Sequence, residues 1–149
     1  MFSRNVLSGG AFTVAEKSGK VSSRMPGDLM AASPLAFAFL SKFSIECKHH
    51  RSMPLLQYLV DPKAGGELGK IIMLARKQAA AIGLSFFICF KQNRIEPLIF
   101  VSEQTGYLIL ESLKKEYDVP MHHKFHGGRV FCMRFVDFLS HVDPIRFLE

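Results

Sequence analysis

Residues 43–51 read FSIECKHHR, and apolar and polar side chains alternate over the first six of them. Successive side chains of a β-strand point to opposite faces of a sheet, so the alternation predicts a half-buried strand. Cys47 falls on the apolar face and is expected to point into the core. Glu46 and Lys48 fall on the other face, which places a carboxylate and an ammonium side by side.

The sequence upstream of this strand carries weaker signals. Residues 3–28 mix Ser, Gly and Lys with short apolar pairs. They predict a short strand or hairpin that approaches a turn at 25–27. The apolar run at 34–40 fits a helical turn and a strand equally well, because its period does not separate the two.

Downstream, periodicity and turn signals predict an alternation of helices and strands. Gly83 supplies the stop of the first helix, and Ser102 supplies the cap of the second. The expected elements are a connection over 52–66, a helix over 67–82, strands at 84–90 and 97–101, a helix over 103–117, a polar loop at 122–128 and a strand over 129–139. This order predicts an α/β or α+β sheet with helices packed on it.

Length and composition exclude several classes of protein. A chain of 149 residues fits one domain, which we expect to span 1–149. The longest uncharged stretches have 13 residues, fewer than the ~18–20 that span a bilayer, so no membrane helix is expected. The first residues lack the apolar segment of a secretory signal. Cys47, Cys89 and Cys132 are too widely spaced for a disulfide framework and predict free thiols in a reducing cytoplasm.

The positive charge is concentrated in the first third of the chain. The formal net charge is +6, and residues 1–51 contain seven Lys and Arg against three Asp and Glu. A polyanion such as a nucleic acid is therefore a candidate partner for this part of the chain. The alternative is that the charge only maintains solubility.

A second carboxylate, which could share a metal site with Glu46, precedes the 43–48 strand. Asp28 ends the sequence Pro26-Gly27-Asp28, 18 residues before Glu46. At the start of a neighbouring strand, Asp28 would join Glu46 and Lys48 on one sheet face. Mg²⁺ prefers such all-oxygen surroundings and lowers the pKa of a bound water that can attack phosphorus. Lys48 can orient or deprotonate this water or neutralise charge on the phosphate, and the backbone carbonyl of Cys47 is a further candidate ligand.

The sequence PGD followed by IECK, with Glu46 18 positions after Asp28, resembles the motif of the PD-(D/E)xK nuclease superfamily. Further features are similar to phage-encoded, Holliday-junction-resolvase-like members of this superfamily. They are the turn at 8–11 (SGGA), the basic stretch ECKHHRS, the helix with Arg76 and Lys77, and the stretch FFICFKQNRIEPLIFV. The resemblance covers residues 8–101. It implies an α/β fold with a restriction-endonuclease-like core, a mixed central β-sheet flanked by helices. It also implies a Mg²⁺-dependent DNA endonuclease, with Mn²⁺ able to substitute, in the cytoplasm of a bacterial host or phage-infected cell.

The site residues follow from these two lines of reasoning together. The catalytic candidates are Asp28, Glu46, Lys48 and Gln78, and the metal candidates are Asp28, Glu46 and Cys47. Gln78 lies at the edge of the apolar stripe of the 67–82 helix, where it fits a hydrogen bond to the attacking water and an ordinary surface position equally well. The candidates for contacts to DNA phosphates are Ser8, Gly9, His49, Arg51, Lys91 and Arg94. Taken singly, each charged residue also fits a solvated surface position.

The chain departs from the resolvase-like pattern at its start. Many of those proteins have an additional Glu on a helix before the first strand, and here the sole acid upstream of Asp28 is Glu16. Glu16 is either a substitute ligand or, as we favour, an exposed residue at a strand end. If no residue replaces the missing acid, either the site holds one metal rather than two, or the chain begins downstream of the start that is typical of the family. We expect a homodimer acting on branched DNA, because a symmetric substrate needs two cuts. The alternative is a catalytically inactive nuclease-fold protein that binds DNA or serves in phage assembly.

Overall fold

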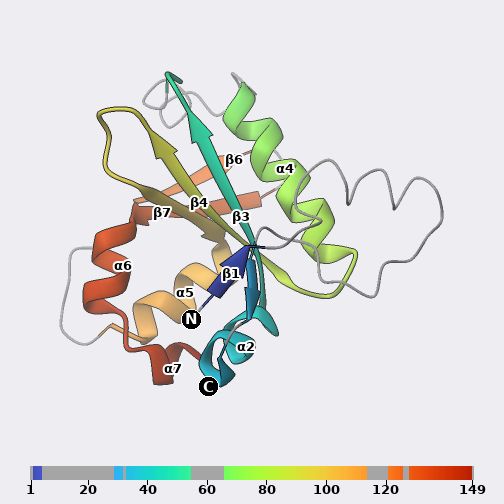
Figure 1. The fold of residues 1–149 in the computed structure, drawn as a ribbon. Helices are drawn as coiled ribbons and strands as arrows, with labels where there is room; N and C mark the ends of the chain where they lie inside the picture. Colours follow the sequence, from blue (N-terminus) through green and yellow to red (C-terminus); the bar gives the residue numbers. More distant parts are fainter. Residues whose placement is uncertain are drawn as a thin grey trace.

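The computed structural model describes residues 2–4, 29–31, 33–54, 66–113, 121–125 and 128–148. The candidates Ser8, Gly9, Glu16 and Asp28 lie outside these ranges. The described chain forms a two-stranded antiparallel sheet of β1 and β2, a five-stranded sheet, and helices on both faces of the latter (Figure 1). The strands are β1 Phe2–Arg4, β2 Leu29–Ala31, β3 Phe43–His50, β4 Ser85–Gln92, β5 Leu98–Ser102, β6 Met121–Phe125 and β7 Gly128–Arg134. The helices are α2 Pro34–Leu40, α4 Glu67–Ala80, α5 Glu103–Glu111, α6 Phe135–His141 and α7 Pro144–Leu148.

The larger sheet is mixed, as the sequence predicts. Its strand order is β3-β4-β5-β7-β6. The pair β3 and β4 is parallel, whereas the other neighbouring pairs are antiparallel. Parallel neighbours need a crossover connection, and α4 lies within it. The predicted α/β class with helices around a mixed sheet is therefore confirmed.

One face of the sheet packs against α4. The apolar stripe of this helix is Leu68, Ile72, Ala75 and Ala79, and all four side chains are buried. They join Phe86, Ile88 and Phe90 of β4 in one core cluster. The helix ends within two residues of the predicted boundary. Gly83 follows it in the left-handed region with φ 72°, a conformation that glycine adopts without strain.

The opposite face packs against α2, α5, α6 and α7, which Figure 1 shows on the other side of the sheet from α4. The ambiguous run at 34–40 forms a helix because Ser33 accepts a hydrogen bond from the Ala36 backbone N–H and Pro34 occupies the first turn. Helix α5 approaches β7 closely. A Cβ on Gly106 would lie 2.2 Å from the Phe131 ring, so only glycine fits there.

The sequence reasoning is wrong at three places near the C-terminus. The predicted polar loop at 122–128 contains strand β6, which pairs with β7 from Met121 to Phe125. The predicted strand over 129–139 ends at Arg134. The next residue, Phe135, donates its backbone N–H to the Pro97 carbonyl at 2.8 Å, but proline has no N–H to donate in return. There α6 begins, and Arg134 NH2 donates to Asp137 Oδ1 at 2.8 Å. The predicted helix over 103–117 ends at Glu111. None of the described helices combines the length and apolar character needed to cross a bilayer.

Candidate active site

Strand β3 places Glu46 and Lys48 on one face, as the alternation predicts. Lys48 Nζ lies 2.8 Å from Glu46 Oε2. The two residues are register partners of Ile88 and Phe90, whose side chains belong to the core cluster beneath α4. The carboxylate and the ammonium therefore form an ion pair on the α4 face of the sheet.

This face of β3 is more buried than the sequence suggests. The pattern of a half-buried strand predicts solvent on the polar side, yet Ser44 is 2% exposed and Glu46 is 6% exposed. The cause is α4, which covers this side of the sheet as well as β4. Burying an unpaired carboxylate is strongly unfavourable, so Lys48 supplies the compensating charge, while its own side chain stays 31% exposed.

The third member of the predicted site cannot be placed. Asp28 lies immediately before β2, outside the described residues, so its position relative to Glu46 stays a prediction. The strand that follows it is not the neighbour of β3 that the sequence predicts, because β2 pairs with β1 in a separate sheet. Within the described ranges, no group of three or more His, Cys, Asp or Glu side chains is arranged to hold a metal ion. The structure thus brings together two of the three residues on which the metal site depends.

Cys47 does not lie in the core, which corrects the sequence prediction. Its side chain is on the face opposite Glu46, as expected, but it is exposed. Among the residues that the structure describes, a groove of about 320 Å³ opens at this end of the strand, lined in part by Cys47, His49, Cys89 and Lys91. The hydrogen bond from Cys47 and burial together raise the pKa of the Cys89 thiol far above its ordinary value. The role of the Cys47 carbonyl as a metal ligand stays a prediction.

Gln78 lies on the flank of α4 that faces β3. The opposite flank carries Arg76, which stacks over the Phe86 ring at 5.5 Å and shares a surface cleft with β5 and β7 residues. At the start of α4, Glu67 Oε1 lies 3.7 Å from His50 Nδ1. Gln78 is about 16 Å along α4 from Glu67, and Glu46 is about 13 Å back along β3 from His50. Gln78 is half-buried, and its hydrogen bond to the attacking water stays a prediction.

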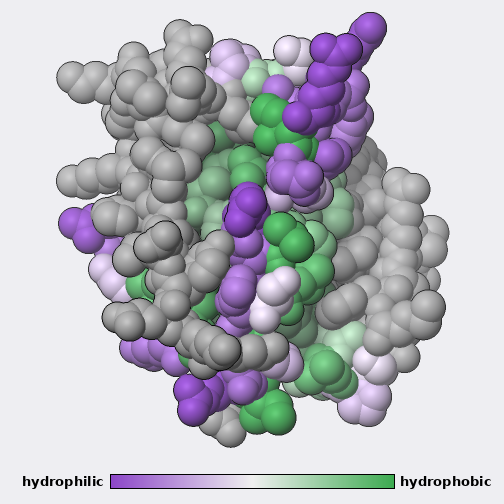
Figure 2. Space-filling view, turned by 90° about the vertical axis from the view of Figure 1, so that its left-hand side faces the viewer, coloured by the Kyte–Doolittle hydropathy of each residue, from purple (hydrophilic) through white to green (hydrophobic). Residues whose placement is uncertain are grey.

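The predicted phosphate-binding residues that the structure describes cluster at the C-terminal end of β3 and β4. His49 and Lys91 are register partners. His49 Nε2 lies 3.1 Å from Asn93 Oδ1 in the turn after β4, and Lys91 Nζ donates to the Ile95 carbonyl at 2.6 Å. Arg51 directly follows β3 and is exposed. Figure 2 shows one group of hydrophilic side chains at the upper end of the molecule, where β3 ends in Figure 1, and others along the middle and the lower edge of the same face.

Arg94 in this turn has an unusual backbone conformation. Its φ is 63°, in the left-handed region that costs an ordinary residue about 1–2 kcal/mol relative to glycine. Non-glycine residues with such strain cluster at functional sites. The strain therefore favours a role for the Arg94 side chain over that of a turn residue alone.

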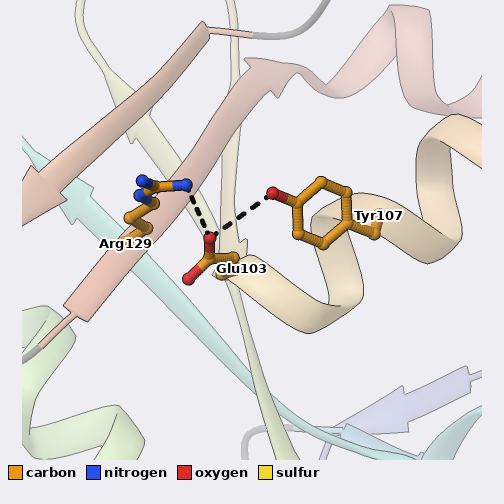
Figure 3. A network of polar contacts seen from close by, with 3 residues as sticks. All are labelled: Glu103, Tyr107 and Arg129. Carbon is orange, nitrogen blue, oxygen red and sulfur yellow. Dashed lines mark hydrogen bonds and ion pairs between the residues drawn. The ribbon is translucent and has the colours of Figure 1, made fainter.

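One polar network was not identified from the sequence. Figure 3 shows Glu103 and Tyr107 of α5 next to Arg129 of β7, with Glu103 Oε1 3.0 Å from Arg129 NH1 and 3.5 Å from the Tyr107 hydroxyl. It lies near the start of β7 and the end of β5, at the opposite end of the sheet from His49 and Lys91. Both charged side chains are more than a third exposed, so this is a surface ion pair of small stabilising effect. Its partners are 26 residues apart, and no local pattern indicates the pairing.

No family model, no curated protein sequence and no solved structure matches the chain. We therefore infer its function from the geometry of the β3 site and from the sequence motif.

Proposed function

We propose that this protein is a metal-dependent DNA endonuclease of the PD-(D/E)xK type, acting on branched DNA in the manner of Holliday-junction resolvases. The observation that carries the proposal is the buried Glu46 carboxylate, 2.8 Å from Lys48 Nζ, on a strand whose parallel partner follows the crossover helix α4. A motif of only three residues is common by chance. A buried acid paired with a lysine on one face of a sheet strand is less so.

The donor set of the site fits a hard divalent cation. Carboxylate oxygens are the preferred ligands of Mg²⁺ and Mn²⁺, and Glu46 supplies one carboxylate in a setting screened from water. Asp28 and Glu46 would hold the ion, which when bound supplies Lewis-acid stabilisation and a more acidic water. The burial of Glu46 also strengthens the electrostatic effect of these charges, because solvent screens them less.

Protein side chains take the other roles in the reaction and in DNA binding. Lys48 holds the attacking water or neutralises charge that develops on the phosphoryl oxygens, because its ammonium lies beside the carboxylate. Gln78 positions the water or a phosphate oxygen from α4. The basic residues at the end of β3 and β4 hold the DNA backbone, without reading its sequence. A homodimer would present two such sites to a symmetric junction.

The test is cleavage of four-way, flap and linear DNA with Mg²⁺, Mn²⁺ or EDTA. Wild type should cut in the presence of either metal, whereas Lys48→Ala and Asp28→Asn should each reduce turnover by about 100-fold or more. Both variants should still shift a labelled junction in a gel, because the lost groups act mainly in the transition state. Lys77→Ala is the matched control, since it removes the same charge from the exposed face of α4.

The outcomes separate the proposal from its rival. Tight junction binding by a wild-type protein that cuts no substrate would favour the catalytically inactive DNA-binding or assembly protein. Cleavage that survives Lys48→Ala would move the catalytic assignment to other residues.

A further inference from the structure

Cys47 and Cys89 meet across the only parallel strand pair of the five-stranded sheet as described. They are register partners in β3 and β4, and both residues line the same groove. Neighbouring strands are about 4.8 Å apart, which falls within the range of about 4.4–6.8 Å for Cα atoms joined by a disulfide. The two thiols are therefore spaced for a covalent link.

Solvent reaches this thiol pair but not the third cysteine. Cys47 is exposed and Cys89 is half-buried, and both line the groove that also contains His49 and Lys91. Cys132 is 4% exposed and belongs to the core cluster on the other face of the sheet. An oxidant dissolved in water would thus meet Cys47 first, with Cys89 as its nearest thiol neighbour.

We propose that Cys47 and Cys89 are an oxidisable dithiol that closes to a disulfide when a peroxide enters the groove. Cys47 loses its proton to solvent, and its sulfur attacks one peroxide oxygen. The O–O bond breaks, leaving a sulfenic acid on Cys47 and releasing water. The sulfur of Cys89 then attacks the Cys47 sulfur, and its proton leaves with the departing hydroxide as a second water. Two thiols are oxidised by two electrons, and one peroxide is reduced to two waters.

The link would act on the neighbouring ion pair through the strand backbone. Cys47 stands between Glu46 and Lys48 in the sequence. A disulfide draws the two Cβ atoms to about 3.8 Å, roughly 1 Å closer than the usual strand spacing. Displacing catalytic groups by about 1 Å can lower a rate about 100-fold. This consequence rests on the proposed nuclease function, whereas formation of the disulfide does not.

The experiment exposes full-length reduced protein to hydrogen peroxide, blocks remaining thiols with iodoacetamide and analyses the peptides by mass spectrometry. We expect a peptide pair linked through Cys47 and Cys89, lighter by two hydrogens and split by dithiothreitol. Cys89→Ser should lose the link, and Cys132→Ala, the matched control, should keep it. A link that involves Cys132, or oxidation of Cys47 to a sulfinic acid with Cys89 still alkylated, would overturn the proposal.

A second arm measures junction cleavage by the oxidised and re-reduced protein. Oxidation should lower wild-type cleavage at least tenfold, dithiothreitol should restore it, and Cys89→Ser should not respond. If the disulfide forms and cleavage does not change, the effect on the active site is refuted. If the protein never cleaves DNA, the nuclease function fails, and the peptide analysis still decides whether the dithiol exists.

Discussion

Replacing Lys48 by Met should destabilise the protein by leaving the Glu46 carboxylate buried without its partner. Removing one member of a buried ion pair usually costs about 3–5 kcal/mol. The Glu46 side chain is 8% exposed, but Lys48 is 31% exposed, so solvent screens part of the interaction. We therefore expect a loss of about 2 kcal/mol in the free energy of unfolding. For a chain of this size that corresponds to a fall of roughly 4–8 °C in Tm.

The assay is a double-mutant cycle by urea denaturation. Glu46→Gln should cost only about 1 kcal/mol, because the long Lys48 side chain can extend its ammonium into water. The double variant Lys48→Met/Glu46→Gln buries no charge and should be more stable than Lys48→Met alone. The expected coupling energy is about 1–2 kcal/mol. Single-variant losses that simply add in the double variant would refute the buried ion pair.

Two further predictions concern the C-terminal ends of β3 and β4 and the core beneath α4. The triple variant Arg51→Ala/Lys91→Ala/Arg94→Gly should bind DNA more weakly, and equally so for all sequences, when binding is measured by fluorescence anisotropy. The slope of the logarithm of the binding constant against the logarithm of the salt concentration should flatten by about 0.9 per lost phosphate contact. An unchanged slope would show that these residues are not part of the interface. Burial raises the pKa of the Cys132 thiol from 9.0 to about 12. Because the folded-state pKa is the higher one, its stabilising contribution is complete below pH 9 and is lost as the pH rises towards 12. The free energy of unfolding should therefore fall more steeply above pH 9 in wild type than in Cys132→Ala, and equal slopes in urea denaturation would contradict this.

The local periodicity of the sequence determined which residues share a face. Alternation over Phe43–Lys48 put Glu46 and Lys48 side by side, and the 3.6-residue repeat put the apolar stripe of α4 on one side of the helix. Both follow from backbone geometry within one element. For that reason the predicted strands at 84–90 and 97–101 also agree closely with β4 and β5.

The tertiary structure decided which of those faces are covered. Periodicity could not reveal that α4 buries the polar face of β3 at Glu46, or that the helices on the other side leave Cys47 exposed, because burial depends on a different element. The contact between Cys47 and Cys89, 42 residues apart in sequence, depends on the parallel register of β3 and β4. The strand β6 likewise exists through its pairing with β7 and not through its His-rich composition. Contacts of this kind are set by the packing of distant segments, which no window of the sequence contains.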